Sequence, residues 1–506
     1  MESKSNMVTF YHDIEQDIDS DIGADPEECR RIVDEFLRLE AQYNIPATYN
    51  VVGKLFLEQP DLIERIRNYG QEVAFHSYHH RTQSRYYAEE IDLCKKAPTR
   101  ARVYGYRSPQ SRWNQTTLKN LWNNGFLWNA EADEHEEPYF IHKGLVCLPI
   151  ATDDWTLHTG ELDIEAWVEQ FSDLLKTRRY FAFGSHDCTT SFAPKARLDV
   201  WERILQTATE SDCLIVDFSE AADLFRRAKL SQYYSAAAKN WNCDTKSLYR
   251  TRRFQEIIRC EAEKLDLPVV ADLGSGGGVL SLPLQDIAEK IYCVDNAPGM
   301  IRDLGKSGSI EARAGEVTES NLPDNSIDFV ICARVIEYLF WHERLSDAIK
   351  RICRPGATYL VTFPALCEKV PQQKGPAPDR IRHYFTPAEI REWADRIGPG
   401  RLIGVQYERA EPGGGGAEER YRAIERDPRT GACPVNWVYV GTVQEAYVPK
   451  RYGGTIPVSA FDFCLSDSDY PDGWVRRHLQ NARARIPQSI RRFCTKIAGS
   501  DVFCGR

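Results

Sequence analysis

Residues 70–80 read GQEVAFHSYHH, an apolar strand-like run that ends in three histidines within five positions. His76 and His80 are four residues apart. On a helix, or on a tight loop that enters one, side chains at this spacing point the same way and can share one metal ion. His79 faces away in such an arrangement, and we assign it a structural role. Solvated surface histidines are the commoner interpretation of one such pair, so the rest of the chain must decide.

Short apolar segments alternate with helix-like segments through the first half of the chain. Examples of the apolar segments are MVTFYHDIE (7–15), IPATYNVVG (45–53) and RYFAFGSHD (179–187), and a typical helix-like one is PEECRRIVDEFLRLEAQYN (26–44). This alternation predicts parallel strands joined by crossover helices, as a barrel or a doubly wound sheet. Both architectures gather ligand-binding groups at the carboxyl ends of the strands. Several residues with reactive side chains fall at such ends: His12, Asp13, His76, Arg107 and His186.

Five short segments occur in a fixed order at these strand ends: HDIE (12–15), HSYHH (76–80), YRSP (106–109), DDW (153–155) and SHD (185–187). Their order and residue types resemble the polysaccharide deacetylases of carbohydrate esterase family four, over roughly residues 7–225. The resemblance implies an irregular (β/α) barrel and a metal-dependent removal of acetyl groups from N-acetylated amino sugars. Amide hydrolysis at neutral pH fits this chemistry, because a divalent metal can activate water and polarise the carbonyl.

The resemblance also implies roles for individual residues. His76 and His80 hold the metal, and the first segment supplies carboxylates. Many relatives have two adjacent aspartates there, whereas this chain has Asp13 and Glu15 in a D-I-E pattern. We assign Asp13 as the base and Glu15 as the third metal ligand, and the reverse assignment, with Asp13 as a ligand, stays open. Alternate strand residues share a face, so both carboxylates reach one site if the strand extends that far.

Three further positions complete the predicted hydrolytic site. His186 is the general acid, and Arg107 orients the catalytic carboxylate, with a surface salt bridge as its alternative. Either Asp153 or Asp154 holds a histidine ring, a role that we assign to Asp154, and a turn is the alternative for both. Zinc is the metal that we expect, although cobalt or nickel suits two imidazoles and a carboxylate equally well. A zincin peptidase is a poorer interpretation, because Ser77 stands where that motif needs a glutamate.

A second strand–helix series begins at VVADLGSGGGVLSL (269–282), where a glycine-rich turn follows a strand. Its candidate cofactor-binding residues are Asp272, Gly274, Gly276 and Gly278. Glycines allow a backbone to approach a ligand closely in such a turn, but a dinucleotide fingerprint would need glycine where Val279 stands. The next strand ends in Asp295, a carboxylate that can accept both hydroxyls of a ribose.

With LPDNSIDFV (322–330) and RPGATYLVTFP (354–364), this half resembles the class I S-adenosylmethionine-dependent methyltransferases over roughly residues 230–450. The resemblance implies a doubly wound, Rossmann-like domain in which Asp295 binds the cofactor ribose and Glu316 faces the adenine amine. Tyr233 and Tyr234 lie on a helix that covers the cofactor in relatives, with core packing as an equal interpretation. Glu337 and His342 are candidate bases, and helix-surface roles are their alternative.

Length, charge and cysteine usage limit the remaining possibilities. A chain of 506 residues is too long for one compact core, and we place the domains at 1–228 and 229–506, the second with a C-terminal extension. The net charge of −10 and the lack of a long basic run argue against nucleic acid as a partner. The 15 cysteines include no C-x-x-C pair, and no apolar run is long enough to span a bilayer. We therefore expect a cytoplasmic protein, whose oligomeric state leaves no mark in the sequence.

The two chemistries can act in sequence. Deacetylation converts a poorly nucleophilic amide into an amine, and an amine is a methyl acceptor. We therefore hypothesise N-deacetylation of an amino sugar in a glycan or glycoconjugate, followed by N-methylation of the freed amine. Alternatives are O-methylation of a nearby hydroxyl on the same glycan, and a first domain that is a degenerate carbohydrate-binding module. Relatives of the first domain also cleave non-sugar amides, which the sequence does not exclude.

Overall fold

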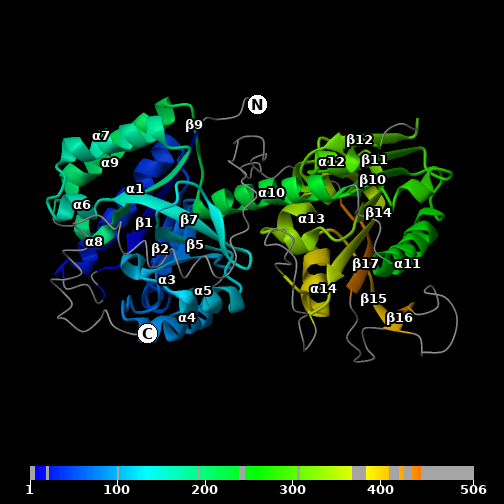
Figure 1. Ribbon diagram of the computed structural model, residues 1–506, viewed down its shortest axis with the longest axis horizontal. Helices are drawn as coiled ribbons and strands as arrows, with labels where there is room; N and C mark the ends of the chain where they lie inside the picture. The colour runs from blue at the N-terminus through cyan, green and yellow to red at the C-terminus, as the bar shows by residue number, and fades with distance from the viewer. Residues whose placement is uncertain are drawn as a thin grey trace. The chain divides into compact units, whose positions relative to one another are not determined.

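The computed structural model describes residues 6–16, 18, 22–99, 102–190, 193–238, 245–304, 308–366, 383–409, 421–426 and 436–445 (Figure 1). These residues form two compact units, one within Met1–Arg226 and the other within Arg227–Val458. The predicted C-terminal extension beyond residue 450 lies outside the described residues. Each unit is described by itself below.

Seven parallel strands of the first unit close into a barrel, which confirms the predicted barrel of deacetylase type. Neighbours pair in the order β1–β2–β3–β4–β5–β7–β8, and β8 pairs back onto β1. A short β9 (Cys213–Ile215) extends the sheet beside β1, and β6 (Tyr139–His142) pairs antiparallel with β7. The barrel strands are β1 (Asn6–Ile14), β2 (Ala47–Val51), β3 (Glu72–Phe75), β4 (Gly105–Arg107), β5 (Trp128–Ala132), β7 (Leu145–Asp153) and β8 (Tyr180–His186).

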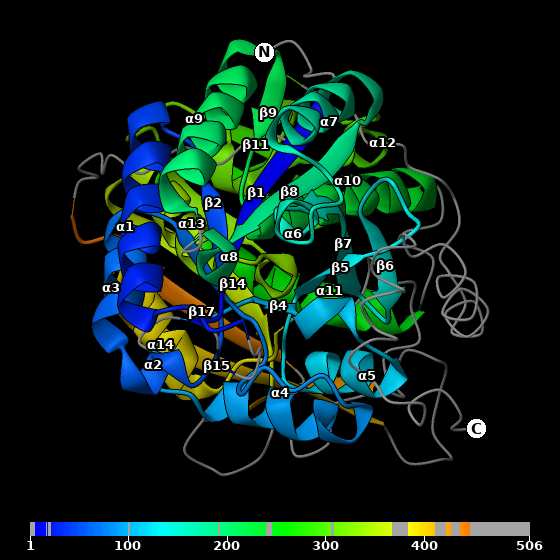
Figure 2. The same cartoon turned by 90° about the vertical axis from the view of Figure 1, so that its left-hand side faces the viewer.

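Helices surround the barrel strands in Figure 2. The first of them, α1, shows why the sequence forms them: Asp25 caps its N-terminus by accepting a hydrogen bond from the Glu27 N–H at 3.0 Å, and Asn44 ends it in a left-handed conformation. Its buried face, which includes Val33 and Phe36, packs into the barrel's hydrophobic core. The helices are α1 (Pro26–Tyr43), α2 (Leu55–Glu58), α3 (Pro60–Asn68), α4 (Tyr87–Lys96), α5 (Gln115–Asn123), α6 (Trp155–His158), α7 (Ile164–Thr177), α8 (Asp187–Thr190) and α9 (Pro194–Glu210).

The second unit is built on a mixed sheet in the order β12-β11-β10-β13-β14-β17-β15-β16, which confirms the predicted doubly wound fold. The first five strands are parallel, and the rest pair antiparallel. The strand order reverses between β10 and β13, and in such sheets ligands bind at the carboxyl ends beside this reversal. The strands are β10 (Val269–Leu273), β11 (Lys290–Asp295), β12 (Ile310–Ala314), β13 (Ile327–Cys332), β14 (Cys353–Pro364), β15 (Gly400–Arg409), β16 (Tyr421–Arg426) and β17 (Asn436–Thr442).

Two hydrophobic clusters cover the two faces of this sheet. Along β10, Ala271 and Leu273 belong to one cluster and Val270 to the other, as expected from the alternation of side chains along a strand. Helices α13 and α14 contribute to the first cluster, and α11 contributes to the second. The helices of this series are α10 (Phe218–Ala237), whose first residues belong to the barrel unit, α11 (Thr245–Ala262), α12 (Pro298–Ile301), α13 (His342–Ile352) and α14 (Pro387–Asp395).

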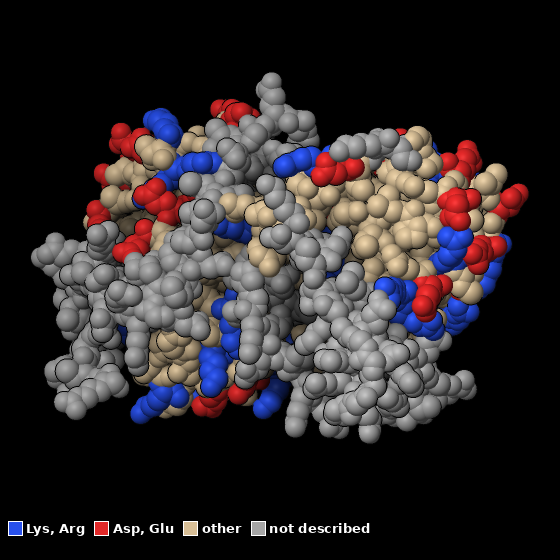
Figure 3. Space-filling model, turned by 45° about the vertical axis from the view of Figure 1, so that its right-hand side comes forward, with Lys and Arg blue, Asp and Glu red and all other residues tan. Residues whose placement is uncertain are grey.

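Acidic and basic side chains are interspersed over the described surface that faces the viewer in Figure 3. In the described part of the chain, no helix combines the length and apolar character needed to cross a bilayer.

Candidate functional site

The strand-end residues of the barrel meet because the parallel strands are in register. Asp13, near the carboxyl end of β1, pairs with Asn50 of β2 on one side and with His186 of β8 on the other. His76 follows the last residue of β3, and Arg107 is the last residue of β4. Strands of a parallel barrel present their carboxyl ends at one rim, so residues far apart in the sequence become neighbours.

Glu15, His76 and His80, the predicted metal ligands, form one cluster. The Glu15 Oε1 atom lies 3.1 Å from His76 Nε2 and 3.0 Å from His80 Nε2, and all three side chains are buried. No helix brings the two histidines together. A turn does so, in which Ser77 and His80 have φ angles of +59° and +63°. His79 points elsewhere, with its Nδ1 atom 3.1 Å from Glu90 Oε1.

The donor set of this cluster fits a divalent metal. The His80 Nε2 atom is buried and lies 3.0 Å from Glu15 Oε1. Burial lowers the pKa of His76, which favours the neutral imidazole that binds metals, whereas Glu15 outweighs burial and raises the pKa of His80. Burial opposes ionisation of Glu15, but His80 and His76 outweigh it and hold the pKa of Glu15 well below its usual range. Two imidazoles and an ionised carboxylate are a ligand set that zinc, cobalt and nickel accept.

Asp13 lies beside this cluster and is fixed by two other side chains. Its Oδ2 atom accepts a hydrogen bond from Arg107 Nε at 2.6 Å, and its Oδ1 atom accepts one from Asn50 Nδ2 at 2.9 Å. Burial opposes its ionisation, but the Arg107 guanidinium more than compensates and lowers the pKa of Asp13. Asp13 Oδ2 is 3.9 Å from His76 Nε2, farther than the Glu15 oxygen. Asp13 is therefore an ionised carboxylate next to the histidine pair.

His186 is held by Asp154 rather than by Asp153. Its Nδ1 atom hydrogen-bonds Asp154 Oδ1 at 2.7 Å, which leaves Nε2 directed toward Asp13 Oδ2 at 3.6 Å. Burial disfavours the imidazolium, but Asp154 outweighs it and raises the pKa of His186 well above its usual value. Asp153 instead accepts from the Trp155 N–H at 3.1 Å, and Arg107 Nη2 lies 3.6 Å from its Oδ2 atom.

Three residues at this site were not assigned roles from the sequence: Asn50, Asp187 and Cys188. Asn50 could have been noticed as a polar residue near the end of an apolar strand. Asp187 directly follows His186, and its carboxylate accepts a hydrogen bond from the Glu15 main-chain N–H at 3.0 Å. The Cys188 thiol donates a hydrogen bond to Glu15, with 3.7 Å between Sγ and Oε2. Burial raises the pKa of the Cys188 thiol well above its usual value, with the Glu15 charge adding to the effect, which keeps the thiol protonated.

The glycine-rich turn of the second unit follows β10 at the strand-order reversal. Gly274, Gly276 and Gly278 have φ angles of +76°, +53° and +71°, a region that L side chains rarely adopt. A Cβ atom at Gly274 would lie 2.2 Å from Val335 Cγ2, so only glycine fits there. Asp295, at the end of β11, accepts hydrogen bonds at 2.8 Å from the Gly276 N–H and the Ala297 N–H. This cradle fits the adenosine end of a nucleotide-like cofactor.

Asp272 and Glu316, the other predicted cofactor residues, have different surroundings. Asp272 is buried and accepts a hydrogen bond from Ser281 Oγ at 2.7 Å, and burial raises its pKa to about 7. The Asp272 side chain therefore links the end of β10 to Ser281, beyond the glycine-rich turn. Glu316 accepts a hydrogen bond at 3.3 Å from the side chain of Asn296, the residue after Asp295, and its Oε2 atom lies 3.6 Å from Arg227 Nη1.

The remaining candidates of the second unit are two tyrosines of α10, Glu337 and His342. The rings of Tyr233 and Tyr234 are 5.1 Å apart, and Tyr234 also approaches Tyr338 at 6.4 Å. Glu337, the residue before Tyr338 in the sequence, is buried. The His342 ring lies 4.9 Å from Phe385 and is therefore part of an aromatic cluster.

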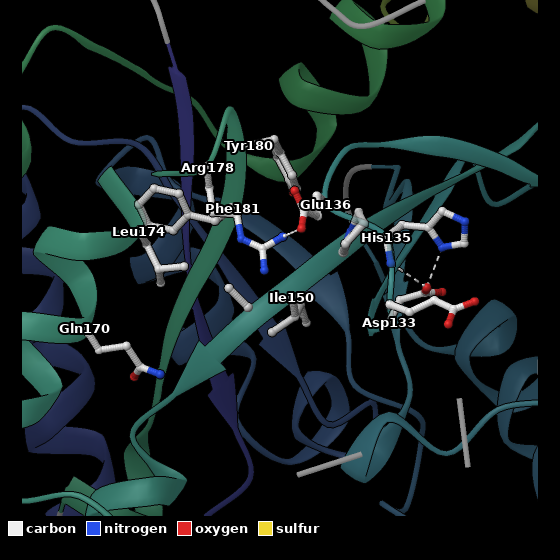
Figure 4. Close-up of a pocket in the computed structure, with 12 residues that line it drawn as sticks. Asp133, His135, Glu136, Ile150, Gln170, Leu174, Arg178, Tyr180 and Phe181 are labelled. Carbon is white, nitrogen blue, oxygen red and sulfur yellow. Dashed lines mark hydrogen bonds and ion pairs between the residues drawn. The ribbon is translucent and has the colours of Figure 1, made fainter. Parts of the chain in front are cut away.

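A separate cavity of about 230 Å³ lies on the flank of the barrel, between the loop after β5 and residues of β7, α7 and β8 (Figure 4). Two close contacts join residues that line it: His135 Nδ1 lies 2.5 Å from Asp133 Oδ1, and Arg178 Nη1 lies 2.5 Å from Glu136 Oε1. The predicted site residues are not among those that line it.

Comparison with known proteins gives two family matches. Residues 20–127 match the polysaccharide deacetylase family, and residues 271–361 match the methyltransferase domain family. A probable S-adenosylmethionine-dependent methyltransferase of Mycolicibacterium smegmatis is 24% identical over 151 residues, which are 30% of this chain and 59% of that protein. This chain therefore spans less than two thirds of the length of that curated relative.

Solved structures similar to each half are also known. A probable polysaccharide deacetylase from Pseudomonas aeruginosa PAO1 is 17% identical, covers 43% of this chain and 90% of its own, and has a TM-score of 0.38. An S-adenosylmethionine-dependent methyltransferase from Thermotoga maritima, described as a possible histamine N-methyltransferase, is 16% identical. It covers 42% of this chain and 99% of its own, with a TM-score of 0.30.

The two family matches fall on the two units whose folds are the predicted ones. The first match includes His76, His80 and Arg107. The second match includes the glycine-rich turn and Asp295. The chain therefore contains a domain that matches the polysaccharide deacetylase family, followed by a domain that matches the methyltransferase domain family.

Proposed function

We propose that this chain is a bifunctional enzyme that removes the acetyl group from an N-acetylated amino sugar and then methylates the freed amine. The observation that carries the proposal is the convergence of Glu15, His76 and His80 on one point, with Asp13 and His186 beside them. Such a cluster unites a metal-binding set with two proton-transferring groups, which amide hydrolysis requires.

In the deacetylase domain, Glu15, His76 and His80 would hold a divalent metal, with zinc as the expected ion. When bound, this metal supplies Lewis acidity for the acetyl carbonyl and for water. The distances favour Glu15 over Asp13 as the carboxylate ligand, because one Glu15 oxygen lies within 3.1 Å of both imidazoles. That leaves the Asp13 carboxylate to accept a proton, which is the role of the base.

Arg107 would keep the proposed base Asp13 ionised, and Asp154 would keep the proposed acid His186 protonated. The Arg107 guanidinium, 2.6 Å from Asp13, keeps the base ionised. Asp154 fixes the tautomer of His186 through Nδ1 and stabilises its protonated form, so that Nε2 can give a proton to the departing amine. The acetamide and one water thus become an amine, acetate and a proton.

In the methyltransferase domain, Asp295 would bind the ribose of S-adenosylmethionine, and Glu316 would lie near its adenine. The cofactor supplies a methyl group on a sulfonium, which a neutral amine can attack without a protein nucleophile. The products are the N-methylated amine, S-adenosylhomocysteine and a proton. The left-handed turn at Gly274 and Gly276 supports this assignment, because it brings the Gly276 backbone N–H to the Asp295 carboxylate.

The order of the two reactions follows from nucleophilicity. An amide nitrogen shares its lone pair with the carbonyl, so it is a poor methyl acceptor until the acetyl group has been removed. One chain that carries both activities can therefore convert an N-acetyl group into an N-methylamine. The acceptor that we propose is an amino sugar within a glycan or glycoconjugate.

The test uses the full chain with an N-acetylated chitooligosaccharide, Zn²⁺ and isotopically labelled S-adenosylmethionine. Mass spectrometry should show the loss of one acetyl group and then the gain of a labelled methyl group. His76→Ala should abolish both changes, whereas Asp295→Ala should abolish only the methyl gain. Methylation that continues undiminished in His76→Ala would contradict the sequential model and point to O-methylation.

Metal analysis of the purified chain separates hydrolysis from mere sugar binding. We expect about one equivalent of bound zinc, cobalt or nickel, and its loss in His76→Ala. A wild-type chain that binds no divalent metal and does not deacetylate after metal addition would instead make the barrel a carbohydrate-binding module.

A further inference from the structure

Glu15 lies just beyond the last residue of its strand. β1 ends at Ile14, and the chain turns at Gln16, which has a φ angle of +48°. Glu15 is therefore outside the regular ladder of hydrogen bonds that fixes Asp13. A glutamate also has one more rotatable bond than an aspartate, so its carboxylate needs other contacts to stay in place.

Asp187 supplies contacts to the main chain at this turn. Its Oδ1 atom accepts a hydrogen bond from the Glu15 N–H at 3.0 Å, and its Oδ2 atom accepts one from the Gln16 N–H at 3.3 Å. Both donors would otherwise be unpaired where the strand ends, and Asp187 is completely buried. The carboxylate thus continues the hydrogen bonding of β1 beyond its last residue.

Cys188 supplies a contact to the side chain of Glu15. Its thiol donates to Glu15 Oε2 at 3.7 Å. The other oxygen, Oε1, is the one that lies within 3.1 Å of His76 and His80. One oxygen of the carboxylate is therefore anchored, and the other is presented to the imidazoles.

The next two residues of the same segment act on the other side of the site. Thr189 Oγ1 donates to Asp154 Oδ2 at 2.7 Å, and Thr190 Oγ1 lies 3.3 Å from the same oxygen. Asp154 in turn holds the His186 ring. The short helix α8 therefore contacts the partner of the predicted acid as well as the predicted metal ligand.

We propose that Asp187 and Cys188 are positioning residues that hold Glu15 as the third metal ligand, an inference that rests on the proposed metal site. Partners of this kind, one step removed from the metal, typically change metal affinity by about 10- to 100-fold when they are mutated. Neither residue contacts the substrate or the metal in this role, so each acts only through Glu15.

The experiment measures Zn²⁺ affinity of the full chain by competition with a chromophoric chelator, together with the absorption spectrum of the Co²⁺ form. Asp187→Asn places an NH₂ group against the Gln16 N–H, and Cys188→Ala removes the donor to Oε2. We expect each variant to bind Zn²⁺ about tenfold or more weakly and to shift the Co²⁺ bands. Cys94→Ala, which removes an equally buried thiol on α4, should leave affinity and spectrum unchanged.

A double-mutant cycle distinguishes positioning from a general loss of structure. In the Glu15→Gln background the ligand is already impaired, so Cys188→Ala should have little further effect on Zn²⁺ affinity. Thermal unfolding of the metal-free chains identifies any variant that is merely unstable. For such a variant, affinity is measured below its unfolding temperature, where the same cycle applies.

Three results would count against these ideas in different ways. Wild-type Zn²⁺ affinity in both Asp187→Asn and Cys188→Ala would overturn the positioning role and leave the proposed metal site intact. Equal losses with and without Glu15→Gln would overturn it too, because the effect would not pass through Glu15. A wild-type chain that binds no Zn²⁺ would overturn the metal site and this inference together.

Discussion

Asp13 and His186 are register partners on adjacent strands β1 and β8, and His186 Nε2 lies 3.6 Å from Asp13 Oδ2. The proposed base and acid are thus neighbours, although almost the whole barrel sequence separates them. Strand pairing fixes the positions of their main chains. Arg107 favours the ionised form of Asp13, and Asp154 favours the protonated form of His186.

Asp154→Asn should reduce deacetylation by roughly 100-fold and move its pH profile. Asp154 raises the pKa of His186, so its loss lowers that pKa. A general acid works when protonated, and activity should therefore decline at a lower pH on the alkaline side. The measurement is kcat against pH, and an unchanged alkaline limb would contradict the role given to His186.

Arg107→Lys should raise the pKa of Asp13, because a lysine loses the 2.6 Å contact of the guanidinium Nε. A base works when ionised, so the acid limb of the pH profile should move to higher pH. We expect kcat/KM near neutrality to fall about tenfold or more. An acid limb in the wild-type position would show that Arg107 does not act through Asp13.

Chelation should separate the two activities. Removing the metal with a chelator should abolish deacetylation, because His76, His80 and Glu15 alone cannot activate water. Methylation of a substrate that already carries a free amine should continue at the rate of the metal-loaded chain. Methyl transfer that stops with the metal removed would contradict the division of labour between the domains.

Gly274→Ala should weaken S-adenosylmethionine binding by about tenfold or more, since the added Cβ meets Val335 Cγ2 at 2.2 Å and the φ angle is +76°. Val335→Ala in the same chain should restore part of the affinity by removing the clash but not the backbone strain. Gly308→Ala is the matched control, because its added methyl group would have no neighbouring atom within 4 Å. Calorimetric titration measures S-adenosylmethionine affinity in all four chains, and wild-type affinity in Gly274→Ala would contradict the role of this turn.

Glu131→Gln should change how stability depends on pH. Burial raises the pKa of Glu131 from 4.5 to about 8, so the folded chain holds a proton there that the unfolded chain has released. The contribution of Glu131 to stability should therefore fall as pH rises between these values, by at most about 1.4 kcal/mol per pH unit. Above about pH 8 this contribution is lost and the curve levels off. Urea unfolding of Glu131→Gln should show a pH slope that is smaller by this contribution, and a slope identical to that of the wild type would assign it to other groups.

The deacetylase family match covers only part of the candidate site. The deacetylase match begins at residue 20 and ends at residue 127, so Asp13, Glu15, Asp154 and His186 lie outside it. Their association with His76 rests on the order of the strand-end segments and on the barrel geometry.

The sequence by itself determined the two folds and the residue types at their strand ends. Strand–helix alternation requires parallel strands, parallel strands share a carboxyl rim, and the glycine spacing after β10 requires a turn that a Cβ would obstruct. Those are local or periodic properties, which a linear pattern records.

Only the tertiary structure decided which neighbouring carboxylate serves which partner. It placed Asp154, not Asp153, against His186, and it brought Asp187 to the Glu15 main chain across 172 positions of sequence. Adjacent aspartates look alike in a pattern, but their side chains leave the backbone in different directions. Hydrogen bonds depend on tenths of an ångström between segments that meet only after folding, so no local spacing encodes them.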